Sequence, residues 1–203
     1  MQKIKSVCVY CGSSPGRTPH YGDAARTLGS AIARAGMTLI YGGGVRGIMG
    51  AVAKAAADSG GQVTGIMPRF LISREGADMD PQELDDLIVT EDMHARKHMM
   101  FERSDSFVAM PGGIGTLEEI VEILTWAQLG RHKKPIVFAN IHGFWNPMLT
   151  LIDHMEAEGF LHSRHLVRPV VVNEAKDIVP AILAAGRSAA GDAEGDQAVI
   201  EKM

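Results

Sequence analysis

The chain has 203 residues, of which 46% are hydrophobic and 22% are charged, and its formal net charge is −4. This length suits one domain with a substantial core. The lack of a basic excess argues against a general binder of nucleic acid or of membrane surfaces. The sequence contains no apolar run as long as a membrane span, and its N-terminus lacks the cleavage site of a signal peptide. We therefore expect a cytoplasmic enzyme or binding protein.

Strand-like and helix-like segments alternate along the first third of the chain. Residues 4–14 form an apolar strand pattern that ends in a turn of small polar residues, and 21–36 form an amphipathic helix pattern closed by a glycine. A second strand over 37–44 and a second helix over 48–61 follow, and then a third strand over 62–68. This order predicts parallel pairing with right-handed crossovers.

The alternation continues after an irregular segment, residues 68–86, which we interpret as a mobile surface loop. The later strands are expected at 87–90, 105–113, 134–140 and 168–173, and the later helices at 91–104, 115–130, 144–159 and 175–186. Residues 187–203 are rich in Ala, Gly and Asp and are expected to be disordered. The sequence thus predicts a single α/β domain over 1–186, a doubly wound (Rossmann-like) parallel sheet flanked by helices.

Cys8 and Cys11 form a C-x-x-C pattern. Thioredoxin-type chemistry places this pattern at a helix N-terminus, where the helix dipole lowers the pKa of a thiol. Here Cys8 lies inside a strand-like run, so the two thiols should diverge. We expect two small residues that pack near the end of a strand.

Three loops that follow predicted strands have an unusual composition: "CGSSPG", "YGGGVRGIMG" and "PGGIGT". Glycine allows positive φ and a close approach of backbone N–H groups to a ligand, and a helix N-terminus adds free donors, so these loops could bind a phosphate. Their spacing matches neither the dinucleotide fingerprint nor a P-loop, which disfavours an oxidoreductase or an NTPase and favours a nucleoside monophosphate or a sugar phosphate. The alternative is that the glycines only close tight corners. The candidate phosphate-binding residues are Ser13, Gly43, Gly112, Gly113, Ile114, Gly115 and Thr116.

Glu119 allows two interpretations. Thr116 and Glu119 fit a capping box, in which both side chains satisfy donors at the start of a helix. Alternatively, Glu119 faces the same cleft as the phosphate loop, where a carboxylate can stabilise a cationic transition state or bind ribose hydroxyls. On the preceding predicted helix Arg96 shares a face with two methionines, which is unusual for a solvated surface.

The pair His94 and His98 has the i, i+4 spacing of some zinc sites. The sequence provides no glutamate between them and no obvious third ligand, so we expect no metal site.

At "PGGIGTLEE" together with "MHARKHMM" the sequence resembles the LONELY GUY (LOG) family of cytokinin riboside 5′-monophosphate phosphoribohydrolases. The family signature P-G-G-x-G-T-x-x-E is met from Pro111 to Glu119, and the family's Arg-Lys pair matches Arg96 and Lys97. The segments "CVYCGSSPG", "YGGG" and "TWAQLG" also resemble this family, and the resemblance extends from about Ile4 to Ala184.

The resemblance implies hydrolysis of the N-glycosidic bond between a purine-type base and ribose 5-phosphate, with N6-modified adenosine monophosphates or AMP as substrates and no cofactor. It implies that Arg96 and Glu119 are the catalytic pair and that Lys97, Glu75 and Thr125 line the site. It also implies a homodimer whose site lies close to the subunit interface, and the apolar helix with Trp126 could supply that contact. Members of this family were long labelled lysine decarboxylases, but the sequence shows no lysine in the setting that pyridoxal chemistry requires.

A second hypothesis remains open, in which the chain is a non-catalytic nucleotide or cofactor carrier on the same fold. Such a carrier would use the glycine loops but would not need Arg96 and Glu119 together.

Overall fold

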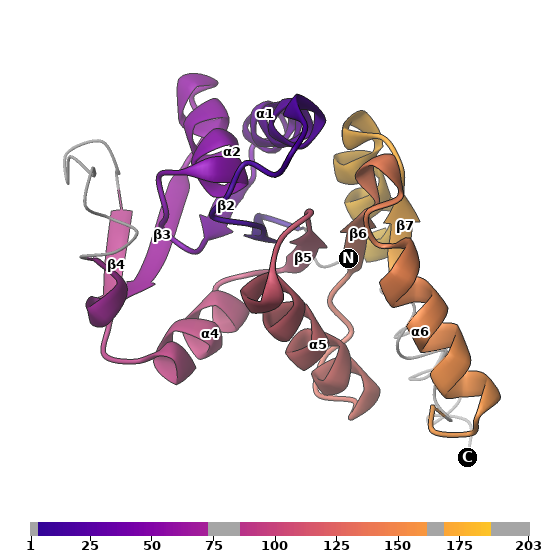
Figure 1. Ribbon diagram of the computed structural model, residues 1–203. Helices are drawn as coiled ribbons and strands as arrows, with labels where there is room; N and C mark the ends of the chain where they lie inside the picture. The colour runs from indigo at the N-terminus through magenta and orange to yellow at the C-terminus, as the bar shows by residue number, and fades with distance from the viewer. Residues whose placement is uncertain (1–3, 73–85, 162–168, 188–203) are drawn as a thin grey trace, which may run out of the picture.

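A computed structural model of the chain describes residues 4–72, 86–161 and 169–187 (Figure 1). The strands are β1 (Ser6–Tyr10), β2 (Thr38–Tyr41), β3 (Val63–Pro68), β4 (Asp86–Thr90), β5 (Ser106–Ala109), β6 (Ile136–Ala139) and β7 (Val170–Val172). The α-helices are α1 (Pro19–Arg34), α2 (Gly47–Asp58), α4 (Met93–Glu102), α5 (Ile114–Gln128), α6 (Asn146–Ala157) and a last helix over 178–187. In the described ranges, the short 3-10 helices η1 (Arg69–Leu71), η2 (Ile141–Gly143) and η4 (Ala175–Asp177) lie between them.

The described strands form one sheet in the order β4-β3-β2-β1-β5-β6-β7, and every neighbouring pair is parallel. The chain first adds strands outward from β1 to β4, and then returns to place β5 against the other side of β1. The predicted doubly wound sheet is therefore confirmed. Its switch point lies between β1 and β5. Tyr10 and Ala109, at the carboxyl ends of these two strands, are register partners. Ligands of open α/β sheets bind at this place.

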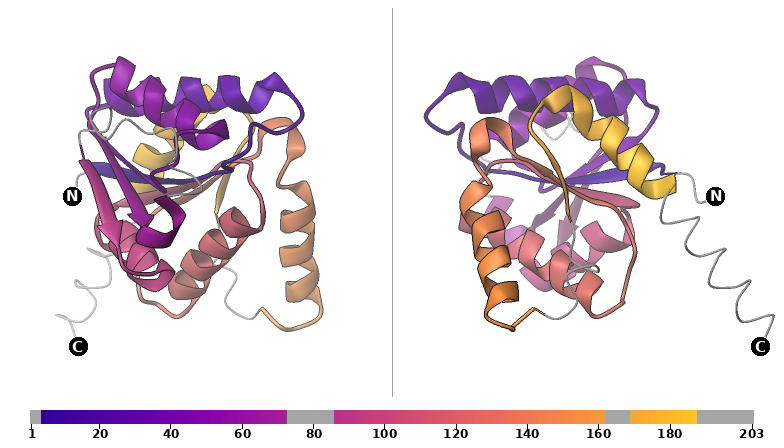
Figure 2. Two further views of the ribbon diagram at one scale, coloured as in Figure 1. Left: turned by 60° about the vertical axis from the view of Figure 1, so that its left-hand side comes forward. Right: turned by 90° about the vertical axis from the view of Figure 1, so that its right-hand side faces the viewer.

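Helices cover both faces of the sheet (Figures 1 and 2). Leu28 of α1, Val52 of α2 and Ile182 of the last helix belong to the core on one face. Met100 of α4, Ile123 of α5 and Ile152 of α6 belong to the core on the other. Because both faces are covered, the central strands are buried along their whole length, as expected for a parallel sheet.

The two cysteines confirm the expectation that their thiols diverge. Cys8 packs in the core under α4 and α5, whereas Cys11 packs in the core under α1 and α2, and both are free thiols. Burial, followed by the negative charge of Glu119, raises the pKa of both thiols far above its ordinary range. They are protonated at neutral pH, so the C-x-x-C pattern is structural.

Parts of the sequence-based predictions lie outside the described residues. These are most of the expected surface loop, with Glu75, and the expected disordered tail apart from Arg187, which ends the last helix. Within the described part of the chain no helix is long and apolar enough to cross a membrane.

Candidate active site

Arg96 and Glu119 form an ion pair near the carboxyl ends of the strands, where the glycine loops begin. Arg96 comes from α4 and Glu119 from α5, and the distance between Arg96 Nη1 and Glu119 Oε1 is 2.9 Å. Their side chains are 7% and 8% exposed, respectively. A buried ion pair gains little net stability because both charges lose their hydration. This pair therefore needs an explanation other than stability, and catalysis or binding provides one.

The start of α4 aims the arginine at the sheet. Asp92 is the N-cap residue of α4 and accepts a hydrogen bond from the N–H of Ala95 at 2.8 Å. The helix therefore begins one turn before Arg96, whose Nε donates to the carbonyl oxygen of Ile66 in β3 at 3.0 Å. Its Nη1 also lies 4.0 Å from the Met93 sulfur, so one side of the guanidinium is fixed by the protein itself.

Gly42 makes room for the guanidinium on its other side. This residue directly follows β2, and a Cβ atom placed on it would collide with Arg96 Nη2. Only glycine lets the loop after β2 pass so close to the arginine. The sequence predicts the loop but not this contact, because the contact joins two segments more than 50 residues apart in numbering.

The turn after β5 leads into the N-terminus of α5, and the space beside the first residues of this helix is open. Gly113 is the N-cap residue of α5 and has no capping side chain. The first N–H groups of a helix have no partner within the helix. A Cβ atom on Gly113 or Gly115 would meet nothing within 4 Å, so packing within the subunit does not require glycine at either position. Gly112 differs, because a Cβ there would collide with the side chain of Thr116.

The capping-box interpretation of Glu119 is wrong. Since α5 begins at Ile114, Thr116 is the third residue of the helix and not its N-cap, and its side chain is buried against Gly112. Glu119 lies a turn further along and pairs with Arg96. The glycines allow the helix to start earlier than the threonine alone would indicate.

The loop after β1 joins the loops after β5 and β2. The N–H of Gly12 donates to the carbonyl of Pro111 at 3.1 Å, and the carbonyl of Gly12 accepts from the N–H of Met49 at 3.1 Å. Ser13 is exposed, and its carbonyl lies where a Cβ on Gly47 would be. Gly43, with φ of +80°, packs against Met67 of β3. The loops after β1, β5 and β2 thus contact one another at this end of the sheet, whereas the nearest neighbours of Gly43 belong to β3 and β4.

Lys97 and Thr125 lie on a different side of the two helices. The Lys97 ammonium donates to Glu118 and, at 3.2 Å, to Glu122. Burial alone lowers the pKa of Lys97, but the hydrogen bonds that it donates to the two carboxylates, together with their negative charge, outweigh burial and raise the pKa. The exposed hydroxyl of Thr125 donates to the Val121 carbonyl at 2.8 Å. A role for either residue in the substrate site stays a prediction.

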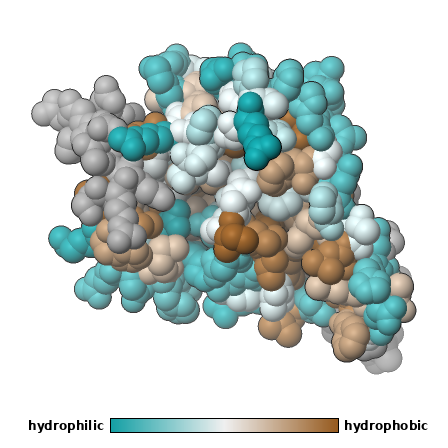
Figure 3. Space-filling view, in the orientation of Figure 1, coloured by the Kyte–Doolittle hydropathy of each residue, from teal (hydrophilic) through white to brown (hydrophobic). Residues whose placement is uncertain are grey.

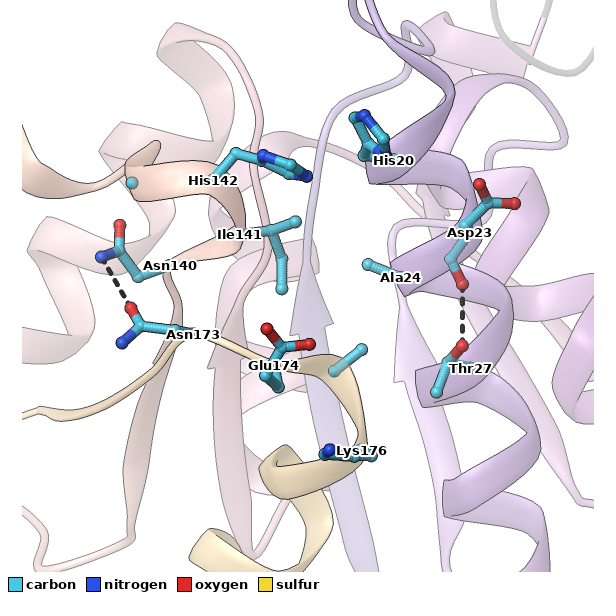
Figure 4. A pocket seen from close by; sticks show the side chains of 12 residues that line it. His20, Asp23, Ala24, Thr27, Asn140, Ile141, His142, Asn173, Glu174 and Lys176 are labelled. Atoms are coloured by element: carbon cyan, nitrogen blue, oxygen red, sulfur yellow. Dashed lines mark hydrogen bonds between the residues drawn. The ribbon is translucent and has the colours of Figure 1, made fainter.

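A cavity of about 540 Å³ opens elsewhere, between α1 and the segments that follow β6 and β7. Figure 4 shows His20 and Asp23 of α1 on one side of it, and Asn140, His142 and Glu174 on the other. None of its lining residues belongs to α4 or α5. In the described part of the chain, no group of three or more His, Cys, Asp or Glu side chains is arranged to hold a metal ion.

The fold and the glycine turns are those of a nucleotide-binding protein. A parallel sheet with glycine turns and a helix N-terminus at its switch point is typical of Rossmann-like proteins that bind nucleotides. Here a buried arginine–glutamate pair lies beside that turn.

Comparison with known proteins identifies the family. A family model described as "possible lysine decarboxylase" matches residues 49–182. The chain is 44% identical over 179 residues to a cytokinin riboside 5′-monophosphate phosphoribohydrolase of Rhodococcoides fascians, covering 88% of this chain and 89% of that protein. It is 41% identical over 179 residues to an Arabidopsis thaliana protein of the same name, covering 87% and 80%. The chain therefore belongs to the LOG family.

Solved structures show the same fold at lower identity. The Moco carrier protein of Chlamydomonas reinhardtii matches with a TM-score of 0.67 and 22% identity, over 92% of this chain and 99% of that chain. At this identity the likeness concerns the fold alone.

Proposed function

We propose that this protein hydrolyses the N-glycosidic bond of purine nucleoside 5′-monophosphates, including N6-modified adenosine monophosphates, and releases the free base and ribose 5-phosphate. The observation that carries the proposal is the buried Arg96–Glu119 pair beside the open helix start at Gly113. The names of the relatives from Rhodococcoides fascians and Arabidopsis thaliana agree with this reaction.

The chemistry of the reaction matches the charges at the site. As the C1′–N bond breaks, positive charge develops on the ribose ring, and the carboxylate of Glu119 stabilises that charge in the transition state. Water adds its oxygen to C1′, and the departing base gains a proton. Glu119 can also accept the proton of the attacking water. Arg96 stays protonated, so it orients Glu119 and the substrate and does not transfer a proton.

The turn from Gly112 to Thr116 would hold the phosphate. Its free N–H groups and the positive end of the α5 dipole suit an anion. Gly113 and Gly115 leave the backbone accessible, although no packing within the subunit requires glycine there. Binding energy at the phosphate then positions C1′, so nucleotides should be much better substrates than nucleosides.

Lysine decarboxylation, the description of the family model, suits this site less well. Amino acid decarboxylases commonly attach a pyridoxal cofactor to a lysine through a Schiff base. The buried cation of the site is Arg96, which cannot form one. The nearest lysine in sequence, Lys97, is paired with two carboxylates that raise its pKa and keep it protonated.

We also propose that the protein is a homodimer in the cytoplasm. Ile114 and Val121 of α5 and its C-cap residue Leu129 lie on one helix face, which they share with Glu118 and Thr125, and they are 80%, 42% and 76% exposed. Figure 3 shows apolar side chains over the start of α5 and toward α6. Trp126, by contrast, packs against Phe101 within the subunit. A partner covering this face would lie beside the phosphate turn, and two free thiols suit a reducing compartment.

The reaction is tested by incubating the purified protein with AMP, N6-isopentenyl-AMP, GMP, CMP and adenosine and separating the products by chromatography. We expect free base and equimolar ribose 5-phosphate from the purine monophosphates, and far less base from adenosine. A folded dimer that binds AMP but releases no base from any purine monophosphate would instead support the carrier hypothesis.

The dimer is tested by analytical ultracentrifugation of Leu129→Asp, with Leu151→Asp as the matched control on α6, where Leu151 is 47% exposed. We expect the first variant to be monomeric and the second to stay dimeric. A monomeric wild-type protein would contradict this part of the proposal.

A further inference from the structure

The last carbonyl of β5 is held by a tryptophan from a distant part of the chain. Trp145, which precedes α6, donates from its indole Nε1 to the carbonyl oxygen of Ala109 at 3.0 Å. Trp145 is 4% exposed. Ala109 is the residue from which the chain enters the turn toward Gly113 and α5.

The Ala109 carbonyl lies where the β5–β6 ladder ends. The last pair of that ladder is Ala109 and Phe138, and the N–H of Asn140 points to the other side of β6 and donates to the carbonyl of Val172 at 2.7 Å. Pro111 has no N–H to donate. At the turn itself, the N–H of Met110 donates to the carbonyl of Tyr10 and the N–H of Gly12 donates to that of Pro111, so both bonds join the turn to the β1 segment. The indole adds a side-chain hydrogen bond to the last carbonyl of β5.

Trp145 is itself fixed in place. Its backbone N–H donates to Asn140 Oδ1 at 2.8 Å, and the Nδ2 of the buried Asn140 donates to Asn146 Oδ1 at 2.9 Å and to Asn173 Oδ1 at 3.1 Å. Figure 4 shows the contact between Asn140 and Asn173. The indole also packs against Phe138, with ring centroids 5.2 Å apart. The ends of β6 and β7 therefore support the indole, and the indole supports the end of β5.

We propose that Trp145 is a positioning residue for the phosphate turn. By fixing the Ala109 carbonyl it sets the direction in which the chain leaves β5, and thus where the N–H groups at the start of α5 point. This role rests on the proposed function of the turn. The hydrogen bonds of Trp145 run to Ala109 and Asn140 and not to the Arg96–Glu119 pair, so its loss should weaken phosphate binding and leave the bond-breaking step largely intact.

The chain offers a matched control because it contains two tryptophans, Trp126 and Trp145. Trp126 is also partly buried in the aromatic core, where it lies edge-on to Phe101 with centroids 4.8 Å apart, but it lies near the far end of α5. Trp145→Phe and Trp126→Phe each remove one indole N–H and part of one ring. A merely structural role would lower the melting temperature in both variants without a selective effect on phosphate.

The first measurement is calorimetric binding of ribose 5-phosphate, followed by steady-state kinetics with AMP. Loss of one aligned hydrogen bond at the turn should weaken ribose 5-phosphate binding by about tenfold in Trp145→Phe and raise KM for AMP similarly, with kcat within about twofold. Trp126→Phe should change neither constant. Equal affinities in the two variants, or a loss confined to kcat, would overturn the positioning role.

A second measurement keeps Trp145 intact and does not depend on the folding of Trp145→Phe. In Trp126→Phe the remaining tryptophan is Trp145, so saturating ribose 5-phosphate should change its fluorescence emission. An emission that does not respond to a ligand whose binding calorimetry detects would overturn the proposal. Neither measurement with ribose 5-phosphate needs turnover. A positive result without base release from AMP would therefore reject the proposed reaction and leave the positioning role standing.

Discussion

Arg96 and Lys97 are neighbours in α4, and Glu119 and Glu118 are neighbours in α5, yet the two ion pairs they form have opposite surroundings. Arg96 and Glu119 are 7% and 8% exposed and reach the glycine loops. Lys97 and Glu118 are 15% and 51% exposed and tie the two helices together on a different side. A step of one residue turns a helical side chain by about 100°, so adjacent charges can have unrelated surroundings.

The exposure of an ion pair indicates whether it contributes to stability or to chemistry. An exposed pair costs little to form, is screened by solvent and contributes little stability. For a buried pair, the attraction between the two charges barely offsets the free-energy cost of removing them from water. The protein retains an arginine and a glutamate in its interior where an apolar pair would pack at no such cost, and it does so at the switch point of the sheet. That contrast supports Arg96 and Glu119, and not Lys97 and Glu118, as the reacting centre.

The largest expected effect comes from removing the buried carboxylate. Glu119→Gln keeps the shape of the side chain but removes its charge, so kcat for AMP should fall by about 100-fold or more. The matched control is Glu122→Gln on the same helix, which loses only a contact with Lys97 and should stay within about threefold of wild type in an HPLC assay of base release. Similar losses of kcat in both variants would contradict the assignment of the reaction to the Arg96–Glu119 pair alone.

A smaller loss is expected from Gly42→Ala. The added methyl group would collide with the Arg96 guanidinium and displace it from Glu119, so kcat/KM for AMP should fall by about tenfold. Gly22→Ala is the control, because a Cβ at Gly22 meets only the end of the Arg26 side chain at 3.5 Å. The same assay, with circular dichroism to verify folding, compares the two. Full activity of Gly42→Ala would show that catalysis does not depend on the observed position of the Arg96 guanidinium.

Lys97→Met should lower the free energy of unfolding slightly and should change kcat for AMP even less. The lysine bridges to Glu118 and Glu122, but Glu118 is half exposed, so solvent screening limits the loss to about 0.5 kcal/mol in urea unfolding. The wild-type advantage should shrink further in 1 M salt. A large fall in kcat for this variant would instead place Lys97 in the substrate site, as the family resemblance implies.

The smallest expected effect is a pH dependence of stability through His132. Its Nδ1 accepts from the N–H of Lys134 at 3.1 Å, and its Nε2 lies 3.0 Å from the Ile123 carbonyl, an arrangement that suits the neutral ring. Burial, and to a smaller extent the charge of Lys134, lowers the pKa of His132 in the folded protein below its ordinary value of 6.5. The folded state then binds fewer protons than the unfolded state. The stabilising contribution is complete above pH 6.5 and is lost as the pH falls through the lowered pKa.

This dependence is measured by comparing the melting temperatures of the wild type and His132→Gln between pH 7.5 and pH 5. We expect the gap between them to shift by about 1–2 °C in favour of the variant at the lower pH. Parallel curves would show that His132 keeps the same pKa on unfolding.

Most of the fold could be predicted from the sequence because the hydrophobic patterns of strands and helices, and the glycines that end helices, are local features. Alternating strand and helix patterns mark the order of elements, and the glycine at position 36 marks the end of α1. The helix predicted over 115–130 starts one residue after the observed start of α5 at Ile114, whereas the capping-box alternative, with Thr116 as N-cap, would start it later. Local patterns cannot choose between these starts, because the choice depends on packing of Thr116 against Gly112.

The site could be predicted only in part, for a related reason. The residues of the phosphate turn and the pair Arg96 and Glu119 stand out by type and by their resemblance to a family. The contacts that hold them join segments far apart in the chain, such as Gly42 with Arg96 and Trp145 with Ala109. Nothing in the sequence near Trp145 signals that its indole reaches β5. Such contacts follow from the strand order and not from any motif.

A crystal structure of Glu119→Gln with AMP bound would show directly how the substrate lies. We expect the phosphate on the N–H groups of residues 113–115 and the C1′ atom of the ribose next to the side chain at position 119. A phosphate bound elsewhere, for example in the cavity beside His20 and His142, or a ribose turned away from position 119, would contradict this expectation.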